Sequence, residues 1–425
     1  MRYWQFSRWK RELSDLKKMG ANTVWFIPFQ FGQRNPEDYE YDSDHWSLQR
    51  AICQEIIDLG MNVGIYSTLN DVFESTLEQH PDWKASNGVL FLEEGCACPS
   101  NPQAWEEILR LRRKVFSELP RIDYLMTPAT DNGGCCCESC EDWPTVYLNS
   151  YKIQAELCRS FHPDVKVVAA SHALSLNRHE KVEKILRNSP WVDYVADIPR
   201  GAGKPIIKYY MNPETTMLGG WGKWGPCPIL PIIERALRTD TKNIAGHIQY
   251  VEGIHDDVNR FAILKMASDQ KATAQSVAEE YVEVWLGVTG ESKKKLAFAI
   301  LELGGGVWAD RTTYVDPNAC VPNPGADQRV LDFLIARSEF PNLENNYRYW
   351  LLLYRALCES MNIISDEIPL EKLHAELALC RENFGKLEPA YAYWLSKLFP
   401  FLLPDQAPWV WPRSFHIAWK KEIEK

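Results

Sequence analysis

A short cysteine-rich stretch, TDNGGCCCESC at 130–140, contains residue types that can hold a metal ion. Within it Cys135, Cys137 and Cys140 have the spacing C-x-C-x-x-C, and the earlier stretch CACPS supplies Cys98. Four thiolates that meet in this way form a closed tetrahedral zinc site, whose role is structural. Free thiols and, in an exported chain, disulfides are alternatives that the spacing leaves open. A thioredoxin-like redox site is less favoured, because CESC lacks the helix and fold that such a motif requires.

The same stretch contains an acid that can take part in sugar chemistry. Hydrolysis of a glycosidic bond uses two carboxyl groups, one protonated as the acid and one acting as nucleophile or base. We assign Asp131 as the acid and Glu214, in MNPETT, as its partner. Glu252, in YVEGIHDD, is a third candidate that replaces Glu214, binds substrate hydroxyls or pairs with Arg260. The plainer alternatives are an Asx turn for Asp131 and a helix-starting acid for Glu214.

Polar and aromatic side chains follow the predicted strands in a way that suits a sugar ring. Amide, acidic and imidazole groups can hydrogen-bond to hydroxyls, and we expect these to bind substrate: Gln30, Asn70, Asn132, His172, Asp197 and His255. Trp221 and Trp224 lie in the glycine-rich segment MLGGWGKWGPCPILP and can stack on a sugar. A rigid loop that buries both rings is the alternative.

The elements that position these residues form a repeating pattern of helix, glycine and buried strand. The joints KKMGANTVWF and IDLGMNVGIY are near copies, in which Gly20 and Gly60 end a helix and a strand follows. Such units build parallel sheets. Strands are predicted at 23–29, 63–69, 122–126, 165–170, 192–196, 205–210 and 247–250, with helices near 7–19, 48–59, 105–119 and 147–160.

Seven strands are one fewer than a closed (β/α)8 barrel of the TIM type requires. Either residues 2–6 form a short first strand, or the barrel lacks it at that edge. From about residue 256 the hydrophobic period becomes helical, with helices expected at 276–286, 293–303, 346–361 and 370–383. The predicted fold class is therefore α/β, with a TIM-type barrel at 1–258 followed by an all-helical C-terminal region at 259–425.

The composition limits the classes of partner. A net charge of −10 over 425 residues argues against nucleic acid, because phosphate binding needs clustered Lys and Arg. No apolar run reaches the roughly 18 residues that span a bilayer, and the charged N-terminal stretch is unlike a signal peptide. We therefore expect a cytoplasmic protein without a membrane partner. The sequence leaves open whether the chain forms a homo-oligomer.

Three motifs together resemble a known group of proteins. TDNGGCCCESC, PETTMLGGWGKWGPCPI and YVEGIHDDVNRF, after a GANTVWF strand, resemble bacterial TIM-barrel proteins of the glycoside hydrolase superfamily, related to hexosaminidase and alpha-glucuronidase barrels. Asp131 and the three cysteines at 135, 137 and 140 match that group's first motif, whereas Asn132 stands where an acid or a longer amide is common. The resemblance covers roughly the first two thirds of the chain.

This resemblance implies a glycoside hydrolase acting on O-glycosyl bonds, with a carbohydrate substrate and no cofactor for catalysis. The departure at Asn132 supports an alternative, a catalytically degenerate carbohydrate-binding or scaffold protein derived from such an enzyme.

Overall fold

The computed structural model of the protein describes residues 6–28, 43–86, 96–128, 134–170, 179–196, 201–211, 226, 228–239, 242–250, 257–303, 325–361 and 367–388. The chain divides into two compact units, one formed by 4–209 with 242–248 and the other mainly by 210–241 with 249–425. Within the described part of the chain, none of the helices combines the length and apolar character that crossing a bilayer requires.

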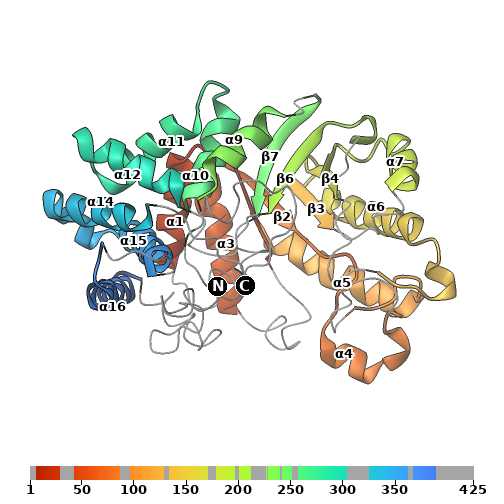
Figure 1. Ribbon diagram of the computed structural model, residues 1–425. Helices are drawn as coiled ribbons and strands as arrows, with labels where there is room; N and C mark the ends of the chain where they lie inside the picture. Colours follow the sequence, from red (N-terminus) through yellow and green to blue (C-terminus); the bar gives the residue numbers. More distant parts are fainter. Residues whose placement is uncertain are drawn as a thin grey trace, which may run out of the picture. The chain divides into compact units, whose positions relative to one another are not determined.

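The first unit is built on a curled parallel sheet of seven strands (Figure 1). In chain order, which is also their order across the sheet, these are β1 (Thr23–Phe26), β2 (Asn62–Tyr66), β3 (Tyr124–Pro128), β4 (Lys166–Ala170), β5 (Tyr194–Ala196), β6 (Ile206–Met211) and β7 (Ile244–Tyr250). All seven predicted strands are confirmed, with ends shifted by a few residues. This sequential order is that of a TIM-type barrel. Residues 2–5 of the predicted first strand lie outside the described residues, and Phe6 is the first residue of α1.

Helices alternate with these strands. Four of them confirm predicted helices: α1 (Phe6–Lys18), α3 (Ser43–Asp58), α5 (Pro102–Glu118) and α6 (Trp143–Phe161). The sequence pattern does not predict α4 (Glu74–Gln79) or α7 (His179–Arg187). Both are short, and a helix of two or three turns shows too few repeats of its apolar stripe to be recognised.

The two echoed glycines end their helices in the same way. Gly20 and Gly60 both have left-handed φ angles, of 99° and 66°, which residues with a Cβ rarely adopt. After α1 the backbone N–H of Gly20 donates to the carbonyl of Lys17 at 3.0 Å, and after α3 that of Gly60 donates to Ile57 at 2.9 Å. The repeated sequence therefore encodes a repeated helix end, and it leads the chain directly into β1 and β2.

One face of the sheet is lined by apolar and aromatic side chains. The strand register aligns Trp25 with Gly64, and Gly64 with Tyr124. A Cβ on Gly64 would lie 2.4 Å from Cδ2 of Trp25, so this position needs glycine. The cluster on this face consists of Met126, Val168, Ala170, Ala196, Ile207 and Ile248, with Trp25, Tyr66, Tyr124 and Tyr194 packed against it.

Two buried tyrosines join α6 to the sheet. The hydroxyl of Tyr151 lies 2.8 Å from the carbonyl oxygens of Leu125 and of Val168, and it donates a hydrogen bond shared between them. The hydroxyl of Tyr147 donates to the carbonyl of Thr127. Because these acceptors belong to β3 and β4, the helix is fixed against the strand that leads into the cysteine-rich stretch.

Apart from the last residues of β6 and β7, the described part of the second unit is mainly helical. Four helical segments confirm predicted ones: α11 (Ala274–Tyr281) with the π-helix Val282–Leu286 that continues it, α12 (Gly290–Glu302), α15 (Tyr347–Met361) and α16 (Leu370–Leu387). The additional helices are α9 (Leu230–Arg238), α10 (Asp257–Ser268) and α14 (Ala326–Glu339). The predicted domain boundary between 258 and 259 falls within α10, and it stays a prediction.

Candidate functional site

The predicted catalytic acids follow strands that the structure confirms. In the chain, Asp131 comes after β3, Glu214 after β6 and Glu252 after β7. Parallel neighbouring strands end at one edge of a sheet, where folds of this kind place their reactive groups. The three acids themselves lie outside the described residues, as do the predicted substrate contacts Gln30, Asn132, His172, Asp197, Trp221, Trp224 and His255.

Asn70 is the predicted substrate-binding residue that the structure describes. It lies in the segment after β2, and it is 1% exposed. Its side-chain amide donates to the carbonyl of Ala97 at 2.8 Å, and the backbone N–H of Ala97 donates to the carbonyl of Asn70 at 2.9 Å. The side chain therefore joins the end of β2 to the segment that carries Cys98. A contact between Asn70 and substrate stays a prediction.

A buried ion pair fixes the same segment after β2. The guanidinium of Arg112, on α5, is fully buried and pairs with the carboxylate of Asp71. It also donates to the carbonyl of Thr68 at 2.8 Å and to that of Asp71 at 3.1 Å. From α6, Gln154 donates to the carbonyl of Leu69 at 2.7 Å. Charge-assisted bonds in a dry interior are strong when both partners are present, so 68–71 is held in one conformation.

The segment that carries Cys98 is held by backbone hydrogen bonds. Cys96 pairs with Asp71 in an antiparallel bridge. The N–H of Cys98 donates to the carbonyl of Trp83 at 2.7 Å, and the carbonyl of Cys98 accepts from Asn101 at 3.1 Å. The position of the Cys98 side chain is thus set by the end of β2 and by the turn that precedes α5.

Four cysteine sulfurs meet where this segment approaches the stretch after β3. The Sγ atoms of Cys98, Cys135, Cys137 and Cys140 all lie within 4.8 Å of one another. The Sγ of Cys98 is 3.7 Å from that of Cys137 and 3.6 Å from that of Cys140. Cys137 is half-buried and the other three are buried. The structure therefore brings together the four side chains that the spacing selects as metal ligands.

The close approach of these thiols changes their acidity. The thiols of Cys140 and Cys98 donate to the sulfur of Cys135, which lowers the pKa of Cys135 far below its ordinary value. The same interaction with Cys135 raises the pKa of Cys98 to about 11, and it raises the pKa of Cys140 further. Two of the four thiols, those of Cys98 and Cys140, are thus harder to deprotonate than an isolated thiol. A cation is needed to hold several of them as thiolates.

The cysteine inside the C-x-C pair points elsewhere. Cys136 is exposed, and its thiol donates to the carbonyl of Ser86 at 3.3 Å. All cysteines in the described part of the chain are free of disulfides. Cys136 is therefore a suitable control for the four clustered cysteines, because it lies in the same loop but its side chain points away from the cluster.

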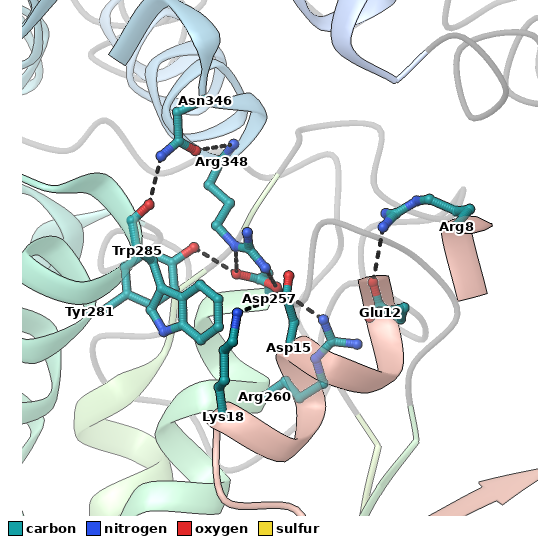
Figure 2. Close-up of polar contacts among 10 residues, drawn as sticks. All are labelled: Arg8, Glu12, Asp15, Lys18, Asp257, Arg260, Tyr281, Trp285, Asn346 and Arg348. Atoms are coloured by element: carbon teal, nitrogen blue, oxygen red, sulfur yellow. Dashed lines mark hydrogen bonds and ion pairs between the residues drawn. The ribbon is translucent and has the colours of Figure 1, made fainter. Parts of the chain in front are cut away.

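A second buried polar cluster lies in the helical unit at the start of α10 (Figure 2). The carboxylate of Asp257 accepts from Nε of Arg348 at 2.7 Å, from Nη2 of Arg260 at 2.9 Å and from the hydroxyl of Tyr281 at 2.8 Å. Burial by itself would raise the pKa of Asp257, but the charges of Arg348 and Arg260 outweigh burial and lower the pKa. Arg260, the structural alternative partner for Glu252, thus forms an ion pair with Asp257.

The guanidinium of Arg348 is also held by aromatic rings. It lies 4.4 Å from the ring centroid of Trp285 and 4.7 Å from that of Tyr347. Asn346 donates to the carbonyl of Trp285 at 2.6 Å, as Figure 2 shows. Cation–π contacts of a desolvated arginine add to the ion pair. The first residue of α10, which follows the segment containing Glu252 and His255 in the chain, is therefore firmly anchored.

The residues that support the site have no sequence motif. For Arg112 the signal is weak: it lies among Ile108, Leu111 and Val115 on the apolar face of the helix, but an arginine in such a position usually extends its charged group to solvent. For Gln154 and Tyr151 no such signal is visible. Their partners are backbone carbonyls, and any residue can supply one.

The fold of this chain resembles those of solved structures. It is similar to two structures of a family 89 glycoside hydrolase from Clostridium perfringens. One is in complex with its substrate GlcNAc-alpha-1,4-galactose, at 12% sequence identity and a TM-score of 0.56. The other is in complex with 2-acetamido-1,2-dideoxynojirmycin, at 12% identity and a TM-score of 0.59. Each alignment covers 91% of this chain and 52% of the other, so this chain spans about half their length.

No family model matches the sequence, and no curated protein is similar to it. At 12% identity the structural similarity shows the fold alone. The chain therefore has a glycoside hydrolase-like fold.

Proposed function

We propose that the protein is a glycoside hydrolase that cleaves a glycosidic bond at the C-terminal edge of its sheet. The observation that carries the proposal is the sequential parallel sheet, in a fold similar to that of the family 89 enzyme over 91% of the chain. The predicted acids support it, because each one follows a confirmed strand in the chain.

In the proposed mechanism Asp131 is the general acid. It protonates the glycosidic oxygen as the bond to the leaving group breaks, while a carboxylate on the opposite side of the sugar acts as nucleophile or activates water. We assign that role to Glu214. In a closed eight-stranded barrel β3 and β6, which are three places apart in the sheet order, lie nearly opposite each other. Glu252, which follows β7, is the alternative partner.

The proposed substrate contacts are polar groups and aromatic rings around this edge. Trp221 and Trp224 stack on the sugar, and the substrate-binding set consists of these two with Gln30, Asn70, Asn132, His172, Asp197 and His255. Replacing either tryptophan with alanine should raise the Michaelis constant, since a stacking contact contributes on the order of 1 kcal/mol. If the two alanine variants keep normal kinetics but have a lowered Tm, the tryptophan rings contribute to packing and not to substrate binding.

A turnover screen with aryl glycosides tests the proposal. It begins with alpha-N-acetylglucosaminides, because the similar enzyme acts on GlcNAc-alpha-1,4-galactose, and it continues through alpha and beta neutral, amino and uronic sugars. Binding without turnover across the whole screen would favour the alternative, a degenerate carbohydrate-binding protein, to which the amide at Asn132 points.

Two substitutions separate the roles of the acids. Asp131→Asn should lower turnover of substrates with poor leaving groups at least about a hundredfold, and of those with good leaving groups much less. Glu214→Gln should impair both kinds. Asp164→Asn is the control, because Asp164 is exposed and precedes β4, at the opposite end of the strands. If Glu252→Gln is inactive while Glu214→Gln keeps nearly wild-type activity, Glu252 and not Glu214 is the catalytic partner of Asp131.

A further inference from the structure

We propose that Cys98, Cys135, Cys137 and Cys140 bind one zinc ion in a closed structural site. The argument begins with the sulfur separations. Four thiolates around one zinc ion at Zn–S distances of about 2.3 Å form a tetrahedron whose edges are about 3.8 Å. Two edges from Cys98 measure 3.6 and 3.7 Å, and all six are within 4.8 Å. The four side chains therefore match a zinc tetrahedron with little movement.

The same distances disfavour the other uses of the cysteines. A disulfide requires sulfur atoms at about 2.05 Å, whereas the four cysteines are free and Sγ of Cys98 lies 3.7 and 3.6 Å from those of Cys137 and Cys140. An iron–sulfur cluster distributes its four thiolates over two or four irons, so not all of them can lie as close together as four thiolates that share one ion. Among divalent ions that accept four thiolates, zinc binds more tightly than ferrous iron.

Hydrogen-bond donors lie beside two of the four sulfurs, as expected for thiolates. The backbone N–H of Ser86 donates to Sγ of Cys135 at 3.4 Å. The hydroxyl of Ser100 lies 3.0 Å from Sγ of Cys140 and can donate to it. The N–H of Cys140 donates to the carbonyl of Cys137 at 2.8 Å, which closes the turn between these two ligands. The contacts from Ser86 and Ser100 stabilise negative charge on the sulfurs of Cys135 and Cys140 and help to orient these two ligands.

The site would join two neighbouring loops at one edge of the sheet. Cys98 belongs to the segment that is hydrogen-bonded to Asn70 and Asp71 after β2, and the other three ligands follow β3. Four protein ligands fill a tetrahedral zinc ion and leave no position for water or substrate. The ion therefore crosslinks the two loops and stabilises them, and this structural role does not depend on the proposed glycosidase activity.

Metal analysis of matched variants tests the site. Protein purified without chelator should contain about one zinc per chain, released by a mercurial thiol reagent and detected with a metallochromic dye. Cys137→Ser should reduce the zinc content to a small fraction of that value. The control is Cys136→Ser, one position away, which should keep the full zinc content because Cys136 is exposed and bonds to Ser86.

Cobalt substitution of the wild-type chain provides a measurement that does not depend on a variant that folds. Replacement of zinc by Co2+ should give the visible absorption bands of tetrahedral cobalt bound to thiolates, and Cys136→Ser should give the same bands. Reduced, metal-free thiols in the purified protein would overturn the proposal. Disulfides among the four cysteines by mass spectrometry, iron in place of zinc, or equal zinc loss in the two variants would also overturn it.

Discussion

Replacing Arg112 with methionine tests whether the segment after β2 depends on its buried ion pair. Methionine keeps the length and helix preference of the side chain, but it leaves the carboxylate of Asp71 and the carbonyl of Thr68 without their donor. Removing one partner of a buried pair costs about 3–5 kcal/mol, because the other charge stays buried and unpaired. In a unit of about 200 residues each kcal/mol lowers Tm by about 2–4 °C, which gives a drop of about 6–20 °C.

The matched control lies on the same helix. Arg110 also pairs with a carboxylate, that of Glu107 at 2.7 Å, but its side chain is 50% exposed. Arg110→Met should therefore cost less than about 1 kcal/mol. Thermal unfolding followed by circular dichroism measures both variants. Equal shifts in Tm for Arg110→Met and Arg112→Met would refute the reasoning.

A second substitution distinguishes the cost of leaving the buried carboxylate of Asp71 unpaired from the cost of lost packing around position 112. Adding Asp71→Asn to Arg112→Met removes the unpaired carboxylate, so the double variant should unfold at a higher temperature than Arg112→Met alone. If the effects of the two substitutions simply add, the ion pair contributes no coupling and the cost lies in the packing of α5.

Two further predictions concern single positions in the two units. Gly64→Ala should destabilise the sheet by about 1–3 kcal/mol and change the near-ultraviolet circular dichroism, because its Cβ would lie 2.4 Å from Trp25; an unchanged spectrum and Tm would contradict this. The pKa of Asp257 is lowered in the folded protein, so its ionised form adds stability above the unfolded pKa of about 4, and that stability is lost as the pH falls through the folded value. Wild type should therefore lose Tm more steeply below about pH 4 than Asp257→Asn, and parallel curves would contradict this.

The sequence predicts most of the sheet because the strands are short buried runs between recognisable helix ends. Gly20 and Gly60 show this most clearly, since a left-handed φ can be read from a glycine after an apolar helix. The sequence does not predict α14. This helix begins directly after Gly325, which has a left-handed φ angle, and the sequence before it is rich in proline and glycine. The local signals there indicate a loop, although a long helix follows.

The sequence by itself determined which side chains have the chemistry of the candidate sites. It supplies the acids at Asp131 and Glu214 and the spacing of Cys135, Cys137 and Cys140, because residue type and short-range spacing are local properties of the chain. Only the tertiary structure decided that Cys98 reaches those three sulfurs. Its position depends on hydrogen bonds to Trp83 and to the end of β2, and on Arg112 and Gln154, which hold that end from two different helices. Contacts between residues far apart in the chain arise from the packing of whole elements, and no local pattern encodes them.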